Sequence, residues 1–221
     1  MTRLLAVDPE QPAAAVCAAA VAVLQRGGVV AYPTDTVYGL AVDALRPEAI
    51  ARLYAVIGRP ESKALPVIIG ALKQLDLVDA TVPATAARLM AAFWPGPLTL
   101  LLPPHRRIPA VLLGESDRIG VRWPASTLSQ QLAIGLGGAI TASSANRSGA
   151  PAALTAAEVM VQLAPAVDLV LDAGTVTSPV VSTIVDVTVQ PACLYRPGKI
   201  AQQAIEAVLG YHLTQKKVDT S

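Results

Sequence analysis

Hydrophobic positions in this chain follow two patterns that alternate from the N-terminus to the C-terminus. Short apolar runs typical of buried strands are followed by longer segments whose apolar residues recur at helical spacing. The apolar runs predict strands at 3–7, 29–32, 65–69, 98–102, 118–123, 139–142, 168–171, 182–187 and 192–195. The helical spacing predicts helices at 9–25, 47–56, 83–93, 127–134, 156–163 and 201–209, with a short helix beginning near residue 71.

This order of elements predicts a single domain of the α/β class. Several predicted strands follow one another without the intervening helix that a parallel crossover requires, so we expect a mixed sheet. No linker-like tract or internal repeat interrupts the periodic segments. We therefore expect a twisted mixed sheet with flanking helices in residues 1–210, followed by a C-terminal tail at 211–221, of which 215–219 is expected to be solvated and frayed.

The N-terminal region predicts an ordinary helix rather than a targeting or membrane segment. Asp8 is placed as an N-cap, Pro9 as the first helical residue and Gln11 as the capping-box partner. Asp8 and Glu10 fall where the apolar part of a signal peptide would begin. The longest apolar stretch, 13–24, is shorter than the roughly 20 residues that span a bilayer. We expect a cytoplasmic protein that does not contact membranes.

Composition and charge argue against a general polyanion-binding protein, a metalloprotein and a histidine-dependent hydrolase. The formal net charge is +1, which provides no global basic field for a polyanion. The two cysteines, Cys17 and Cys193, lie in apolar segments and are expected to be buried free thiols. With two histidines, His105 and His212, and no CxxC or HxxxH spacing, we expect no protein-built metal site and no histidine-dependent triad.

Polar segments that interrupt the apolar runs carry the candidate chemistry. Residues 32–40 hold two threonines, an aspartate and two tyrosines at a strand end, and residues 140–149 open from a strand into small polar residues. Arg59 and Lys63 flank a proline turn before the strand at 65–69. Each segment also fits a local turn that satisfies its own backbone. Neither GxGxxG nor GxxxxGK[ST] occurs, so a bound nucleotide needs another kind of phosphate site.

Arginines within or at the ends of apolar strands favour an anionic ligand. Arg122 lies within the predicted strand 118–123, and Arg196 directly follows the one at 192–195. A buried arginine is costly unless an anion meets it, although internal aspartates or glutamates explain such residues equally well. The residues by themselves indicate an anion-binding α/β protein and do not name a reaction.

The same segments, in this order, resemble the YrdC-like family of threonylcarbamoyl-AMP synthases. The resemblance rests on residues 27–40, the Arg59-Pro60 turn, 122–124, 144–149, 182–186 and 196–198, and it covers about residues 10–210. It implies a twisted sheet that is open to one side, with a large, positively lined, anion-binding cavity. It also implies a reaction in which L-threonine, bicarbonate and ATP give threonylcarbamoyl-AMP and pyrophosphate. The product serves a separate threonylcarbamoyl transferase complex that modifies adenosine 37 of tRNA.

The resemblance assigns a role to individual residues. It implies threonine-binding positions at Thr36, Arg122, Ala142 and Ser182. It implies ATP-binding positions at Arg59, Lys63, Arg118, Ser144, Asn146 and Arg196. Mg²⁺ would arrive with the ATP, the protein would supply no metal ligands of its own, and no residue is assigned as a covalent or acid–base catalyst.

Three departures from the family pattern favour an alternative. The usual Lys-x-Arg is Ile57-Gly58-Arg59, Ile68 stands where many members have histidine, and Ala152 stands where serine is common. These changes bear on catalysis more than on ligand binding or fold, and Ile57 is the feature that favours a paralogue that keeps the cavity, binds a nucleotide or RNA, and has lost or changed the reaction. A carbamoyl-transfer domain, as found in larger hydrogenase-maturation proteins, is a third interpretation.

Overall fold

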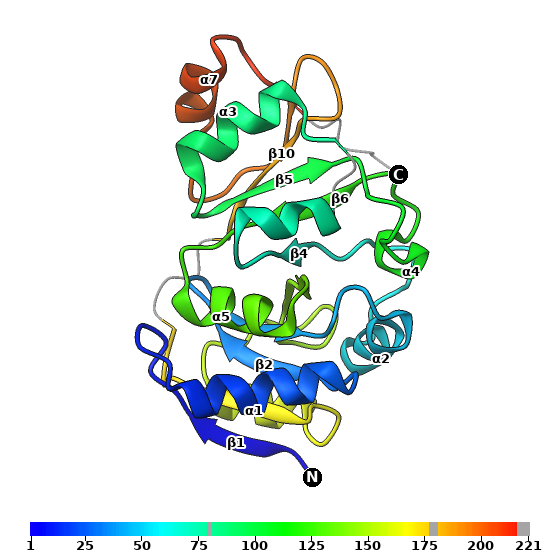
Figure 1. Ribbon diagram of the computed structural model, residues 1–221, viewed down its shortest axis with the longest axis vertical. Helices are drawn as coiled ribbons and strands as arrows, with labels where there is room; N and C mark the ends of the chain where they lie inside the picture. The colour runs from blue at the N-terminus through cyan, green and yellow to red at the C-terminus, as the bar shows by residue number, and fades with distance from the viewer. Residues whose placement is uncertain (79–80, 177–180, 216–221) are drawn as a thin grey trace.

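The computed structural model describes residues 1–78, 81–176 and 181–215 (Figure 1). The expected α/β class with mixed pairing is confirmed, but the strands are divided between two sheets. The first sheet has the order β1-β9-β2-β3-β8 and consists of Arg3–Ala6, Leu169–Asp172, Val30–Pro33, Tyr38–Ala41 and Ser143–Ser144. The second has the order β12-β11-β10-β5-β6-β4-β7 and consists of Thr214–Gln215, Cys193–Arg196, Thr183–Asp186, Leu98–Leu102, Ile119–Arg122, Val67–Ile68 and Ile140–Thr141.

Helices pack against both sheets, and each of the two hydrophobic clusters contains buried residues from both sheets. The helices are α1 (Ala14–Gln25), α2 (Pro47–Ile57), the 3₁₀ helix η1 (Leu72–Leu77), α3 (Ala84–Phe93), α4 (Ala110–Leu113), α5 (Thr127–Leu136), α6 (Ala156–Leu163) and α7 (Gln202–Leu209). In Figure 1, α1 lies with β1 and β2 near one end of the molecule, and α3 and α7 lie together near the other. No helix within these described ranges has both the length and the apolar character needed to cross a membrane.

The second sheet is apolar on one face and mixed on the other. Along β5, Leu98, Leu100 and Leu102 are fully buried in the larger of two hydrophobic clusters. The intervening residues, Thr99 and Leu101, line a cavity. Because strand side chains alternate between faces, a single run of five residues contributes both to the core and to the cavity wall.

The N-terminal helix begins later than the sequence indicates. Asp8 does accept hydrogen bonds from local backbone, since its Oδ1 receives the N–H groups of Glu10 and Gln11 at 2.9 and 3.2 Å. These bonds form an isolated turn, and α1 starts only at Ala14, after an N-cap residue with no side-chain bond. Pro12 gives the reason, because the residue before a proline is disfavoured in the α conformation.

Several short elements were not predicted from the sequence. They are β3, β8, β12 and α4. β3 falls inside the polar segment 32–40, where it pairs antiparallel with β2 from Val30↔Ala41 to Pro33↔Tyr38. β12 places Thr214 and Gln215 of the expected tail beside β11. Lys216 and Lys217 lie outside the described residues.

The two cysteines differ in their surroundings. Cys17 is buried, as expected, and its thiol lies 3.1 Å from Oε1 of Gln131. Cys193 is free as well but only partly buried, because it lies on the face of β11 that lines the cavity. The expectation of burial therefore holds for Cys17 and is wrong for Cys193.

Candidate substrate site

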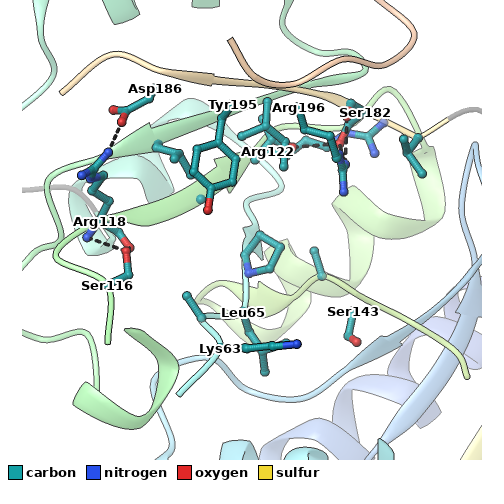
Figure 2. A pocket seen from close by; sticks show the side chains of 18 of the residues that line it. Lys63, Leu65, Ser116, Arg118, Arg122, Ser143, Ser182, Asp186, Tyr195 and Arg196 are labelled. Atoms are coloured by element: carbon teal, nitrogen blue, oxygen red, sulfur yellow. Dashed lines mark hydrogen bonds and ion pairs between the residues drawn. The ribbon is translucent and has the colours of Figure 1, made fainter. Parts of the chain in front are cut away.

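A cavity of about 1240 Å³ is lined by residues from both sheets. Strands β5, β6, β10 and β11 of the second sheet provide one wall. The 34–39 segment, the Arg59–Pro66 turn and the Ser143-Ser144 strand provide the opposite side. In Figure 2, Arg122, Arg196 and Ser182 lie on one side of the space, and Lys63, Leu65 and Ser143 lie across it. The segments singled out from the sequence thus meet around one volume.

Arg122 is a buried cation whose guanidinium is already partly paired. The residue is 7% exposed, its Nε donates to the carbonyl oxygen of Gly96 at 3.0 Å, and its Nη2 lies 2.6 Å from Oδ2 of Asp35. An internal aspartate therefore meets this arginine, one of the two explanations that the sequence left open. Oδ1 of Asp35 is buried without a hydrogen-bond partner in the described structure, so this pair is incompletely satisfied.

Arg196 lies beside Arg122 at the same end of the cavity. Its Nη2 donates to the carbonyl oxygen and Oγ of Ser182 at 2.8 and 3.2 Å, and Ser182 Oγ lies 3.0 Å from Oγ1 of Thr99. Partial burial of the guanidinium and the positive charge of Arg122 lower the pKa of Arg196. Two neighbouring guanidinium groups disfavour each other's charge, and an anion bound between them would relieve this repulsion.

A close approach of two backbones holds Arg196 at that position. A Cβ on Gly198 would lie 2.5 Å from backbone atoms of Val181, Ser182 and Thr183. Only glycine allows the turn after β11 to approach β10 so closely. Gly198 of the Arg-Pro-Gly sequence thereby allows Arg196 to lie within hydrogen-bond distance of Ser182.

Arg118 is bound more completely than the sequence suggested. Its Nε donates to Oδ1 of Asp117 at 2.8 Å, and its Nη1 contacts Oδ2 of Asp186. The hydrogen bond to Asp117 and the charge of Asp186 raise the pKa of Arg118. Both aspartates also line the cavity. Arg118 therefore contributes little net positive charge at this side of the cavity.

The Arg59–Pro66 turn is fixed by its own side chains. Arg59 donates from Nε to the Lys63 carbonyl at 3.2 Å and from Nη2 to the Ala64 carbonyl at 2.9 Å, and Tyr54 donates to the Lys63 carbonyl at 2.8 Å. Gly58 ends α2 in the left-handed region with φ of 63°. The Lys63 side chain is exposed and lines the cavity. This turn thus presents an exposed ammonium group on a backbone that is held by hydrogen bonds from Tyr54 and Arg59.

A small hollow of about 40 Å³ lies between α2 and the serine-rich segment. It is lined by Ile57, Arg59, Ser143, Ser144, Asn146 and Ser148. Asn146 donates from Nδ2 to the carbonyl oxygens of Arg147 and Ala150, both at 2.8 Å, and its Oδ1 is buried with no hydrogen-bond partner among the described residues. Ile57 is 4% exposed and belongs to the core cluster, so it brings no charge to this hollow.

Threonine side chains and a backbone segment complete the floor of the site. Thr36 is 7% exposed, and its Oγ1 lies 3.0 Å from Oγ1 of Thr34, which donates to the Val37 carbonyl. The N–H of Ala142 donates to the Pro66 carbonyl at 2.7 Å. A backbone contact from Ala142 to a ligand would therefore be made by its carbonyl oxygen.

The cavity brings together all of the candidate residues except one. Thr36, Arg59, Lys63, Arg118, Arg122, Ala142, Ser144, Ser182 and Arg196 line it, whereas Asn146 lines only the adjoining hollow. Thr99, Ser116, Asp186 and Tyr195 also line the cavity and were not assigned from the sequence. A threonine between leucines at 98–100 was the available signal for Thr99, because it breaks a fully apolar run.

The described residues contain no group of three or more histidine, cysteine, aspartate or glutamate side chains placed to hold a metal ion. Among the carboxylates that line the cavity, Asp117 and Asp186 are both engaged by Arg118, and Glu115 lies in the same lining. This donor set fits a divalent ion that is carried by substrate phosphates and water better than one held in a protein cage.

A family model covers most of the chain. Residues 22–198 match the model of the Sua5, YciO and YrdC proteins, which is described as telomere recombination. A threonylcarbamoyl-AMP synthase of Pyrococcus abyssi is 37% identical over 187 residues, which are 85% of this chain and 55% of that protein. The Bacillus subtilis enzyme of the same name is 37% identical over 195 residues, 87% of this chain and 56% of that protein.

A solved structure agrees with these sequence matches. P. abyssi Sua5 complexed with L-threonine superposes with a TM-score of 0.92 at 34% identity, covering 100% of this chain and 66% of that one. The fold and the lining of the cavity define a mixed α/β protein with an arginine-rich site between two sheets. This chain belongs to the Sua5/YciO/YrdC family. It spans just over half the length of the P. abyssi and B. subtilis relatives.

Proposed function

We propose that this chain is an L-threonylcarbamoyladenylate synthase, a nucleotidyltransferase that makes threonylcarbamoyl-AMP and pyrophosphate from L-threonine, bicarbonate and ATP. The observation that carries the proposal is the pair of neighbouring arginines, Arg122 and Arg196, on one wall of a cavity lined by hydroxyl groups. The similar proteins named as synthases, and the L-threonine in the P. abyssi structure, support it.

The threonine half of the site would use the buried end of the cavity. Arg122 would hold the carboxylate of threonine, because a guanidinium matches a carboxylate in shape and charge. Thr36 and Ser182 would orient the ligand through hydroxyl groups that are buried and therefore held in one place. The carbonyl of Ala142 would accept a hydrogen bond on the opposite side. These residues bind and position the amino acid, and none acts as a nucleophile.

The nucleotide half would place phosphates between Arg196 and the turn that carries Lys63. Arg59, Ser144 and Asn146 would contact the nucleotide from the side of the small hollow, with Arg118 at the rim. Mg²⁺ bound to the ATP phosphates would neutralise the charge that develops as pyrophosphate leaves. Holding a carbamate on the threonine nitrogen in line with the α-phosphorus can lower a barrier by roughly 7–11 kcal/mol without covalent catalysis.

The test is an incubation of the purified chain with ATP, magnesium, L-threonine and bicarbonate, followed by chromatography. We expect threonylcarbamoyl-AMP and pyrophosphate, with a requirement for both threonine and bicarbonate. ATP binding without either product would reject the synthase. The threonylcarbamoyl-AMP would be the substrate of a threonylcarbamoyl transferase that acts on position 37 of tRNA. We also propose that the protein acts in the cytoplasm.

A second candidate function is a non-catalytic paralogue that binds a nucleotide or RNA. Burial of Ile57 favours it, since position 57 adds no second cation beside Arg59 in the hollow that Arg59, Ser144 and Asn146 share. Such a protein would bind ATP and form no product under the conditions above. Titration of tRNA binding against salt would then separate nucleotide binding from RNA binding, because phosphate-backbone contacts weaken steeply with salt.

A further inference from the structure

Thr99 is a buried polar residue to which the proposed function gives no role. It interrupts the apolar run of β5 between the fully buried Leu98 and Leu100, and it lines the cavity although it is only 4% exposed. Its Oγ1 lies 3.0 Å from Oγ of Ser182. Within the described residues, this serine is the hydrogen-bond partner of the Thr99 hydroxyl. Because a buried hydroxyl is costly unless it is hydrogen-bonded, the contact with Ser182 is what satisfies Thr99.

Packing on both sides of β5 fixes the direction of the Thr99 hydroxyl. β5 pairs antiparallel with β6 and parallel with β10, so Thr99 lies between these two strands. Its Cγ2 lies next to Gly120 of β6, since a Cβ on that glycine would be 3.4 Å from it. A β-branched side chain is restricted at χ1. With the methyl group on the side of β6, the hydroxyl faces Ser182, which directly precedes β10.

The two neighbours of Ser182 Oγ leave one direction for its proton. Arg196 carries donors only, so its Nη2, at 3.2 Å, donates to Ser182 Oγ (Figure 2). A serine hydroxyl has one proton and two acceptor lone pairs. With Thr99 as the second donor, both lone pairs are occupied and the Ser182 proton points away from both neighbours. That proton is then available in the cavity, which Ser182 lines.

An anionic ligand requires this arrangement of protons. Arg122 and Arg196 lie beside Ser182 at one end of the cavity (Figure 2), and their charges favour an anion there. A carboxylate only accepts hydrogen bonds, so Ser182 has to donate in order to contact it. In the reverse arrangement the Ser182 proton would be used in the bond to Thr99. Thr99 must therefore be the donor when a carboxylate lies against Ser182.

We propose that Thr99 is a positioning residue for the amino-acid substrate, which anchors Ser182 Oγ with its own proton and so directs the Ser182 proton at the carboxylate of bound L-threonine. The inference rests on the proposed function, which places L-threonine beside Ser182. Without the Thr99 hydroxyl, the Ser182 side chain is free to rotate and its proton is no longer aimed at the ligand. Thr99 acts through Ser182, so its effect should disappear when the Ser182 hydroxyl is absent.

The experiment is a double-mutant cycle on L-threonine binding, measured by calorimetry for the wild type, Thr99→Val, Ser182→Ala and the double variant. Valine keeps the branched shape and removes the hydroxyl. We expect Thr99→Val to lower the affinity about 3- to 10-fold, which corresponds to one directed hydrogen bond. In the Ser182→Ala background, the same substitution should change the affinity by less than about twofold. Thr99→Ser keeps the donor and should bind within about twofold of the wild type.

Thr155→Val is the matched control for a general loss of stability. Thr155 is the N-cap of α6, where its Oγ1 accepts the N–H of Glu158 at 3.1 Å, and it lies outside the cavity lining. The same substitution therefore removes one hydroxyl hydrogen bond far from any cavity residue in the sequence of β5 or β10. We expect this variant to bind L-threonine like the wild type. An equal loss of affinity in Thr155→Val would overturn the positioning role, because destabilisation alone would then explain the effect.

Three results at Thr99 itself would also overturn the inference. The first is an unchanged affinity for L-threonine in Thr99→Val. The second is an equal loss with and without the Ser182 hydroxyl, which would mean that Thr99 contacts the ligand directly. The third is a failure of Thr99→Ser to retain affinity, which would assign the effect to methyl packing against Gly120.

The outcomes separate this inference from the proposed function. A coupled effect of Thr99 and Ser182 in a chain that forms no threonylcarbamoyl-AMP supports the positioning role and rejects only the synthase. Formation of threonylcarbamoyl-AMP without any effect at Thr99 supports the synthase and overturns the positioning role. A wild-type chain that binds no L-threonine overturns both.

Discussion

The ion pair between Arg122 and Asp35 allows the sharpest test of how this site is built. The two side chains are 9% and 24% exposed, and they are 2.6 Å apart. A hydrogen bond that involves a charged group contributes about 1.5–3 kcal/mol to stability. Arg122→Ala also removes the bond to the Gly96 carbonyl, worth about 1 kcal/mol. Since water still reaches Asp35, we expect Arg122→Ala to cost about 2–3 kcal/mol of unfolding free energy.

A double-mutant cycle isolates the pair from other effects of each substitution. Asp35→Ala, Arg122→Ala and the double variant would be unfolded in urea at pH 7, and we expect a coupling energy of about 1.5–3 kcal/mol. The control cycle uses Arg46 and Glu48, which are 36% and 72% exposed and 3.5 Å apart. Exposed pairs contribute about 0–1 kcal/mol. A coupling at Arg122 no larger than that of the control pair would refute the reasoning.

Threonine binding supplies an independent readout for the same variants. If Arg122 holds the carboxylate of the substrate, Arg122→Ala should lower the affinity for L-threonine by about tenfold or more. A tenfold change corresponds to ~1.4 kcal/mol of binding free energy. Asp35→Ala should bind L-threonine at least as well as the wild type, because the internal carboxylate no longer competes for Nη2. Loss of threonine binding in Asp35→Ala, with the fold intact, would instead assign Asp35 to the ligand.

Three further predictions concern other parts of the chain. Burial opposes ionisation of Asp168, but hydrogen bonds from Arg52 and the Val29 N–H outweigh it and lower the pKa of Asp168. The ionised carboxylate of Asp168 therefore stabilises the fold above the unfolded pKa of about 3.9, and this stabilisation is lost as pH falls through the lower folded pKa. Asp168→Asn should lower the free energy of unfolding, measured in urea, by about 1 kcal/mol at pH 7 and by less at pH 3. Lys63→Ala should lower the affinity for ATP about tenfold, as measured by calorimetry. An unchanged affinity would exclude Lys63 from ATP binding. Ile57→Lys should strengthen ATP binding by a similar factor if the hollow lacks only a second cation beside Arg59. No gain in a folded variant would exclude that explanation.

Local sequence patterns predicted most elements because each depends on its own residues. The strand Leu98–Leu102 and the helix Ala156–Leu163 have the bounds that the apolar spacing indicated. Short elements such as β8 and β12 have two residues each and depend on the neighbour with which they pair. Propensity and periodicity carry too little information over two residues to predict such pairing.

The sequence predicted which residues line the candidate site but not the ion pairs that those residues form. Polar residues at strand ends pointed to one anion-binding region, and the cavity lining includes nearly all of them. The sequence could not show that Arg122 already faces Asp35, or that Arg118 is held between Asp117 and Asp186. The Arg122–Asp35 and Arg118–Asp186 pairs join residues that are distant in the chain.

Sequence alone determined the class of fold, the family and the residues that gather around the cavity, because these depend on local periodicity and on motifs read in order. Tertiary structure decided the division into two sheets and the aspartates that pair with Arg118 and Arg122. These features arise only when segments far apart in the chain meet. Asp186 and Arg118, for example, are separated by 68 positions, and no local pattern in the sequence reports their contact.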